Sequence, residues 1–288
     1  MSLPLWQPAD HADRERIARI VARESAETLV AVPHGIRVAI LSRLLRPAAR
    51  PASARFVSYD RALGDLGASA GSSWIVQRAV DALDVRGDEL VPRSGPLLVV
   101  ANHPGQADAV ALLAAMRRDD AWIVTAEFAF LRALRHASRR FLFVPERAES
   151  RRSVVRDVVA RLRDGEAVLL FPAGGLEPDP DLAPAEASGS FARWSRSIGL
   201  LARRARGTRV VPALVRGAVS RAAFDHPLAR RRTPVTERQR MAALLQLALR
   251  RYQRVRLTVR FGPPIEARPG TDMQQAVLAR MRLLLADH

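Results

Sequence analysis

From Ser73 to the C-terminus, short apolar runs alternate with longer segments that have the apolar spacing of helices. Some runs are apolar at every position, as in Val168-Leu169-Leu170-Phe171. Continuous apolar strands are typical of a sheet buried on both faces, and parallel strands need helical connections between them. We therefore predict an α/β fold with a mostly parallel central sheet, helices on both faces and an N-terminal helical extension.

The alternation predicts the elements in a regular order. Strands are expected near Val85 and at residues 97–101, 121–125, 141–144, 167–171, 208–215 and 254–261. Helices are expected at residues 73–83, 106–117, 128–137, 151–163, 190–205, 235–251 and 271–286.

Two helices are predicted before this region, at residues 10–31 and 36–45. The second alternates apolar residues with arginines, which is the pattern of a helix lying on a membrane or of an ordinary helix packed on the core. Core packing is the more common cause, and we expect it here. Residues 47–73 are rich in Pro, Ala, Gly and Ser and are predicted to be a loose connection. We thus divide the chain into an N-terminal extension with a linker, 1–72, and a main domain, 73–288.

The composition is that of a globular protein, with 48% hydrophobic residues in a chain of 288. The absence of cysteine excludes disulfides, thiolate metal sites and thiol nucleophiles. No apolar run reaches the roughly 20 residues of a membrane-spanning helix, and residues 1–13 lack the pattern of a secretion signal. We expect a cytoplasmic protein with no metal site and no membrane span.

The formal net charge is +17, from 46 basic and 29 acidic residues, and every basic residue is arginine. Such a charge favours an anionic partner, which could be a nucleic acid, an anionic bilayer surface or a polyphosphate substrate. A genomic bias towards arginine is an alternative explanation.

The candidate catalytic residues are His103 and Asp108, which follow the predicted strand 97–101. The proline after His103 favours an extended backbone there, and Pro104 and Gly105 then form a turn into the next helix. This turn brings a histidine at the end of a strand close to an aspartate in the first turn of the helix. A neutral histidine held by a carboxylate can act as a general base near pH 7.

Four strand ends carry motif blocks in order: Asn102-His103 to Asp108, Phe143 to Arg147, Phe171 to Gly175, and Val210 to Ala213. In order and spacing they resemble the blocks of the glycerolipid acyltransferase superfamily, which includes glycerol-phosphate and lysophosphatidic acid acyltransferases. The resemblance extends over most of the chain from Ser73, including Val255 to Ile265.

The resemblance implies transfer of an acyl group from a thioester, acyl-CoA or acyl-carrier protein, to a hydroxyl of a lipid or glycerol-phosphate-like acceptor. His103 would be the general base and Asp108 its orienting partner, and backbone amides near the turn would hold the oxyanion, with Gly105 allowing close approach. The thioester is a co-substrate, and no cofactor is implied. Fatty thioesters and lysolipids lie at bilayers, so we expect a peripheral protein on the inner membrane face.

The resemblance also implies a site for the acceptor phosphate. Arg147 stands where the family has a phosphate-binding arginine, and Arg151 and Arg152 begin the next predicted helix. The third block departs from the family, because Ala173 replaces its glutamate and Gly175-Leu176-Glu177-Pro178 replaces its Gly-Thr-Arg-Ser. Gly174 and Gly175 still permit close approach of a ligand, and Glu177 is a candidate substitute for the missing glutamate. The acidic, proline-rich loop from Glu177 is a candidate lid.

Three alternatives are weighed against this hypothesis. Gly67-Ala68-Ser69-Ala70-Gly71 matches the Gly-x-Ser-x-Gly motif of serine hydrolases, but no buried strand precedes it. A basic nucleic-acid-binding protein would explain the charge, but the aromatic content is only 5% and no recognition helix is evident. A catalytically degenerate scaffold with the same fold would explain the altered third block.

Overall fold

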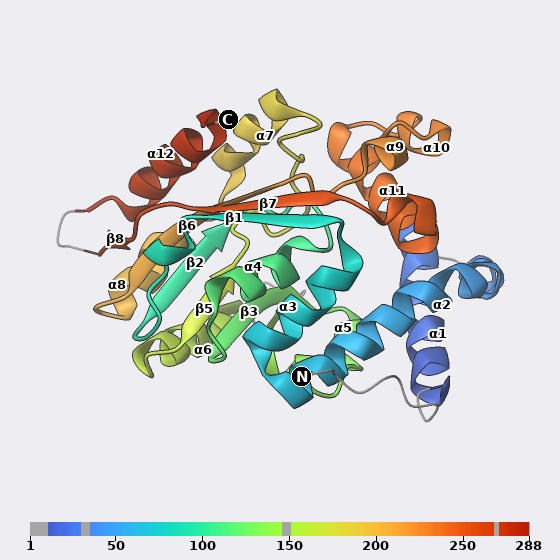
Figure 1. The fold of residues 1–288 in the computed structure, drawn as a ribbon, viewed down its shortest axis with the longest axis horizontal. Coiled ribbons are helices and arrows are strands. Elements are labelled where there is room, and N and C mark those ends of the chain that lie inside the picture. The colour runs from blue at the N-terminus through green and yellow to red at the C-terminus, as the bar shows by residue number, and fades with distance from the viewer. Residues whose placement is uncertain (1–10, 30–34, 146–150, 268–270, 288) are drawn as a thin grey trace.

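The computed structural model describes residues 11–29, 35–145, 151–267 and 271–287. Within these ranges eight strands form one sheet in the order β1-β7-β6-β2-β5-β3-β4, with β8 paired to β6 (Figure 1). The strands are β1 (Ala82–Arg86), β2 (Leu97–Ala101), β3 (Ala121–Ala126), β4 (Phe141–Val144), β5 (Ala167–Leu170), β6 (Arg209–Arg216), β7 (Arg256–Phe261) and β8 (Ile265–Glu266).

The sheet is mostly parallel, as predicted. Strands β6, β2, β5, β3 and β4 run in one direction. Strand β7 is antiparallel to β6, and β1 is parallel to β7. Pro212, which has no amide hydrogen, lies where β6 changes its antiparallel partner from β8 to β7. The ladder can therefore accept a proline in an interior strand.

Helices cover both faces of the sheet. Successive side chains of β2 point to opposite faces and pack on different helices. Leu97, Val99 and Ala101 pack on the side of α4 (Asp108–Met116), together with α3 (Ala68–Ala79). Leu98 and Val100 pack on the opposite side. The helices on that opposite side are α6 (Arg151–Arg163), α8 (Ser197–Arg204) and α12 (Met273–Ala286). Strand β2, buried at every position, is central to the fold.

The N-terminal helices are α1 (His11–Leu29) and α2 (Gly35–Leu66), which pack with α3 around a core of their own at one end of the molecule (Figure 1). The predicted loose connection at 47–73 is wrong, because α2 continues through Pro47 and Pro51 and α3 begins at Ala68. Small residues that resembled a linker are buried, as Ala52 and Ser53 show. The boundary proposed at residue 72 stays a prediction and falls within α3.

Two predicted helices are interrupted in the structure. Residues 128–137 contain only the short α5 (Ala129–Arg132), followed by a 3₁₀ turn. Residues 190–205 contain the end of α7 (Pro184–Ser190), a 3₁₀ turn and α8. Helices α9 (Arg221–Phe224), α10 (Pro227–Arg230) and α11 (Val235–Ala248) form a further cluster. None of the described helices has the length and apolar character needed to cross a bilayer.

Candidate active site

The site begins where β2 ends, at Asn102. Its buried side-chain amide donates to the carbonyl of Val215 in β6 at 2.8 Å and accepts from the amide of Val215 at 2.7 Å. This pair of hydrogen bonds extends the contact between the two strands by one residue. The backbone that carries His103 is thereby fixed to the centre of the sheet.

His103 and Asp108 meet as the sequence predicted. His103 Nδ1 lies 2.8 Å from Asp108 Oδ2, and Asp108 is the first residue of α4. The Asp108 carboxylate also accepts hydrogen bonds from the amides of Gly105 at 3.0 Å and Ala109 at 2.6 Å. Asp108 is fully buried, whereas 29% of the His103 side chain is exposed. The aspartate is therefore a fixed support and the histidine is its accessible partner.

This hydrogen bond also assigns the histidine tautomer. A carboxylate can only accept, so Nδ1 carries the hydrogen and Nε2 keeps its lone pair. Across the described part of the chain, Nε2 makes no hydrogen bond. Phe171, the residue after β5, stacks on the imidazole with ring centroids 4.5 Å apart and planes at 28°. The ring is thus held at one nitrogen and one face, with a basic atom left to react.

Glu177 holds the backbone of His103. Its Oε2 accepts from the amide of His103 at 3.1 Å, and its own amide donates to the carbonyl of His103 at 2.8 Å. Its Oε1 accepts from Ser190 Oγ and Trp194 Nε1, both at 2.7 Å. The Glu177 side chain is completely buried. The carboxylate thus binds the backbone of His103 and two buried donors, and the expected contact of Glu177 with an acceptor stays a prediction.

The loop from Glu177 is packed into the protein. Asp179 is completely buried, and its carboxylate accepts from the amides of Asp181, Gly217 and Val219. Glu177 and Asp179, both buried and bound to backbone amides, fix the start of the loop and argue against an open lid.

Burial and the neighbouring charges act in opposite directions on the pKa of His103. Burial favours the neutral imidazole, but the charge and hydrogen bond of Asp108, with the charge of Glu177, outweigh it and raise the pKa of His103. Burial also raises the pKa of Glu177, although the hydrogen bonds from Trp194, Ser190 and His103 oppose this effect. The imidazole is therefore a stronger base than free histidine.

Gly174 and Gly175 lie in the exposed turn that starts at Phe171, beside His103. Gly174 has φ +69°, a conformation that favours glycine, and a side chain at either glycine would meet only open space. Gly105 differs, because its amide is bound to Asp108 and a Cβ there would lie 3.0 Å from the Cβ of Ala218. Gly105 therefore serves packing of the turn, and the expected close approach of an oxyanion there stays a prediction.

The predicted phosphate-binding arginines are placed only in part. Arg147 lies outside the described residues. Arg151 begins α6, but its side chain is not among the described parts of the chain. Arg152, in the same turn, is exposed. Among the described residues no three His, Cys, Asp or Glu side chains gather as metal ligands would.

Gln239 of α11 is a buried contributor that sequence reasoning missed. Its amide nitrogen donates to the carbonyls of Pro104, at 2.6 Å, and of Glu177, and its amide oxygen accepts from the amide of Asp179 at 2.8 Å. It lies between two arginines in the sequence and resembles a surface position. No local pattern reveals a contact that spans 135 positions.

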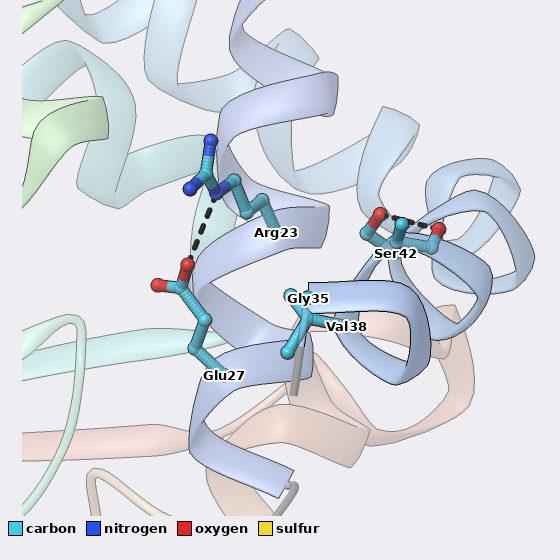
Figure 2. A pocket seen from close by; sticks show the side chains of 6 residues that line it. Arg23, Glu27, Gly35, Val38 and Ser42 are labelled. Carbon is cyan, nitrogen blue, oxygen red and sulfur yellow. Dashed lines mark hydrogen bonds and ion pairs between the residues drawn. The ribbon is translucent and has the colours of Figure 1, made fainter. Parts of the chain in front are cut away.

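A separate pocket lies between α1 and the start of α2 (Figure 2). It is lined by Arg23, Glu27, Gly35, Val38, Ala39 and Ser42. An ion pair joins Arg23 Nε to Glu27 Oε1 at 3.0 Å. This pocket contains none of the predicted site residues.

Comparison with known proteins gives a family match for part of the chain. Residues 82–216 match the family model described as Acyltransferase, and this segment contains His103, Asp108 and Glu177. These residues form an acyltransferase-family domain. The family predicted from the four motif blocks is thus confirmed at the level of this acyltransferase domain.

The chain is also similar to a crystal structure of the 1-acyl-sn-glycerophosphate (LPA) acyltransferase PlsC from Thermotoga maritima. The two share 15% identity with a TM-score of 0.45, over 94% of each chain. No curated protein matches the sequence significantly.

Proposed function

We propose that this acyltransferase-family protein moves a fatty acyl group from an acyl thioester to the hydroxyl of a lipid or glycerol-phosphate-like acceptor. The observation that carries the proposal is the imidazole of His103, held at Nδ1 by buried Asp108 and without a hydrogen bond at Nε2 among the described residues. A general base needs this combination of fixed orientation, an available lone pair and access for substrate.

The proposed reaction proceeds by direct attack. The hydroxyl proton of the acceptor passes to His103 Nε2 while the hydroxyl oxygen forms a bond to the thioester carbonyl carbon. The carbon–sulfur bond then breaks, and the leaving thiolate takes the proton from the imidazolium. Asp108 accepts the Nδ1 hydrogen bond throughout and stabilises the positive ring. No acyl-enzyme intermediate is required.

The acceptor is proposed to bind along the turn of Gly174 and Gly175, with Arg147 and Arg151 as the groups for its phosphate. The turn starts at Phe171, which stacks on His103, so a ligand over the glycines would be close to the base. Guanidinium groups suit phosphate because they donate two parallel hydrogen bonds. Either CoA or a carrier protein can serve as the thioester carrier, and we keep both as candidates.

We further propose that the start of α2 binds an anionic bilayer. Ile36, Ile40 and Leu44 are spaced four residues apart on one face and are 77%, 59% and 70% exposed. We expected the helix over 36–45 to pack on the core, but Val38 is the one fully buried residue of this stretch. Exposed Arg37 and Arg43 adjoin the apolar stripe. Apolar insertion beside basic groups is how amphipathic helices bind anionic membranes.

The activity is tested by incubating purified protein with acyl-CoA or acyl-carrier protein and vesicles that contain single acceptors, including lysophosphatidic acid. Release of free thiol and formation of the acylated lipid are measured together. We expect both to depend on an acceptor. Absence of product across the acceptor panel would contradict the proposal and favour a degenerate scaffold. Salt-dependent binding of DNA or RNA without acyl transfer would favour a nucleic-acid-binding protein.

A further inference from the structure

We propose that Glu177 is a positioning residue for His103: its buried carboxylate fixes the histidine backbone and supplies negative charge that stabilises the protonated imidazole. This inference rests on the proposed role of His103 as the general base. It gives the altered third motif block a function in the base machinery, in place of acceptor binding.

The first support is the two-way contact between the residues. The amide of His103 donates to the Glu177 carboxylate, and the amide of Glu177 donates to the carbonyl of His103. Both polar groups of the His103 peptide backbone are therefore held by one residue. Movement of the histidine along or across the strand end would break both bonds.

The second support is that the carboxylate itself cannot turn away. Ser190 and Trp194 donate to its second oxygen, and both side chains are buried. Gln239 joins the carbonyl of Glu177 to that of Pro104, the residue after His103. The turn 102–105 is thus bound to the loop after β5 and to α11. Such rigid support keeps a base within the narrow geometry that proton transfer requires.

The third support is electrostatic. Among the described residues, the charged groups that act on the His103 ring are Asp108 from α4 and Glu177 from the loop after β5. Burying a carboxylate is costly unless a charge or several donors compensate it. The charge of Glu177 raises the pKa of His103. The imidazolium formed during reaction would be its positive partner.

The test compares Glu177→Gln with Asp179→Asn. Both changes remove the charge of a fully buried carboxylate in the same loop, but Asp179 binds the amides of Gly217 and Val219 and not His103. The pKa of His103 is measured by NMR titration of histidine-labelled protein, assigned by the signal that His103→Asn removes. Values of kcat and KM are measured across pH with the acyl-transfer assay.

We expect Glu177→Gln to lower the pKa of His103, to move the acid limb of kcat to lower pH, and to reduce kcat about ten- to a hundredfold with little change in KM. Asp179→Asn should lower stability without moving that pKa. An unchanged His103 pKa in Glu177→Gln, or equal shifts in both variants, would overturn the inference.

The NMR measurement needs no enzymatic activity, so failure of this inference is distinguishable from failure of the proposed function. If Glu177→Gln does not fold, Ser190→Ala removes one donor from the same carboxylate. We expect the latter change to lower kcat a few fold while Nδ1 stays bound to Asp108. Unchanged kcat in that variant would contradict the positioning role.

Discussion

At the scale of single residues, the pKa of His103 leads to a prediction about pH. Asp108 and Glu177 raise that pKa above its ordinary value of 6.5 despite the opposing effect of burial. A general base works in its neutral form. A raised pKa therefore keeps His103 protonated, and the enzyme inactive, up to a higher pH. We expect kcat/KM to rise with pH through a midpoint above 6.5.

This prediction is checked by the acyl-transfer rate at low substrate concentration between pH 5 and 9, on vesicles of constant composition. His11→Ala serves as the control, because His11 is exposed on α1 and far from the site in sequence. The control should keep the same midpoint. A rate independent of pH on the acid side, or a midpoint below that of free histidine, would contradict the account.

The sequence predicted His103 and Asp108 because both belong to one local turn. A strand end, a proline and a helix start are visible in a few consecutive residues, and they suffice to bring the pair together. The residues that support this turn from other segments of the chain could not be predicted in the same way. Glu177, Trp194 and Gln239 reach the turn through contacts between distant segments, and buried acids and amides look like surface residues in a sequence.

At the scale of elements, the contact between α2 and α3 leads to a prediction about stability. Gly71 of α3 is buried against α2, and a Cβ there would lie 2.7 Å from the carbonyl oxygen of Ala62. Backbone cannot yield as a flexible side chain does, so the helices must move apart. We expect Gly71→Ala to lower the free energy of unfolding by about 1–3 kcal/mol.

The control for this change is Gly189→Ala in α7, where a Cβ would meet nothing within 4 Å. Alanine favours helix over glycine, so this variant should be neutral or more stable by up to about 1 kcal/mol. Both values come from urea denaturation. Equal stability of the two variants would show that α3 does not approach the backbone of α2 closely at Gly71.

The helix contact also explains why the region 47–73 was predicted wrongly. Glycine, alanine and serine are common in linkers, but they also allow two helix backbones to approach closely. Gly71 serves the second purpose, since it is buried directly against the backbone of α2. Composition alone cannot separate these cases, because the difference lies in what packs against the small residue.

At the scale of the whole molecule, the proposed membrane surface is tested by replacing its apolar stripe. The triple variant Ile36→Ser, Ile40→Ser, Leu44→Ser removes three exposed apolar side chains of α2. Losing this apolar insertion should weaken binding to anionic vesicles about tenfold or more. Binding is measured by vesicle sedimentation at low and high salt. High salt should weaken the binding of the wild-type protein to vesicles, because salt screens the attraction between its arginines and the anionic lipids.

The control is Leu228→Ser on α10, which removes an apolar side chain that is 49% exposed on a different part of the surface. It should bind vesicles as the wild type does. Equal binding by the triple variant and the wild type would place the membrane surface elsewhere or exclude it.

The architecture as a whole was predicted with its strands near their observed positions, because apolar runs mark buried strands directly. The order of the strands and the reversed direction of β1 and β7 were not predicted. Strands β1 and β7 run opposite to the parallel set, and β7 lies between β1 and β6. Periodicity identifies which residues are buried but carries no information about which strand each one pairs with.

The most direct test of the central claim is the rate of acyl transfer by His103→Ala compared with His11→Ala, both shown to be folded by circular dichroism. Removing the general base should lower kcat by about 10²- to 10⁴-fold, whereas the exposed histidine should be dispensable. Full thioester-dependent activity in folded His103→Ala would contradict the assignment of His103 as the base.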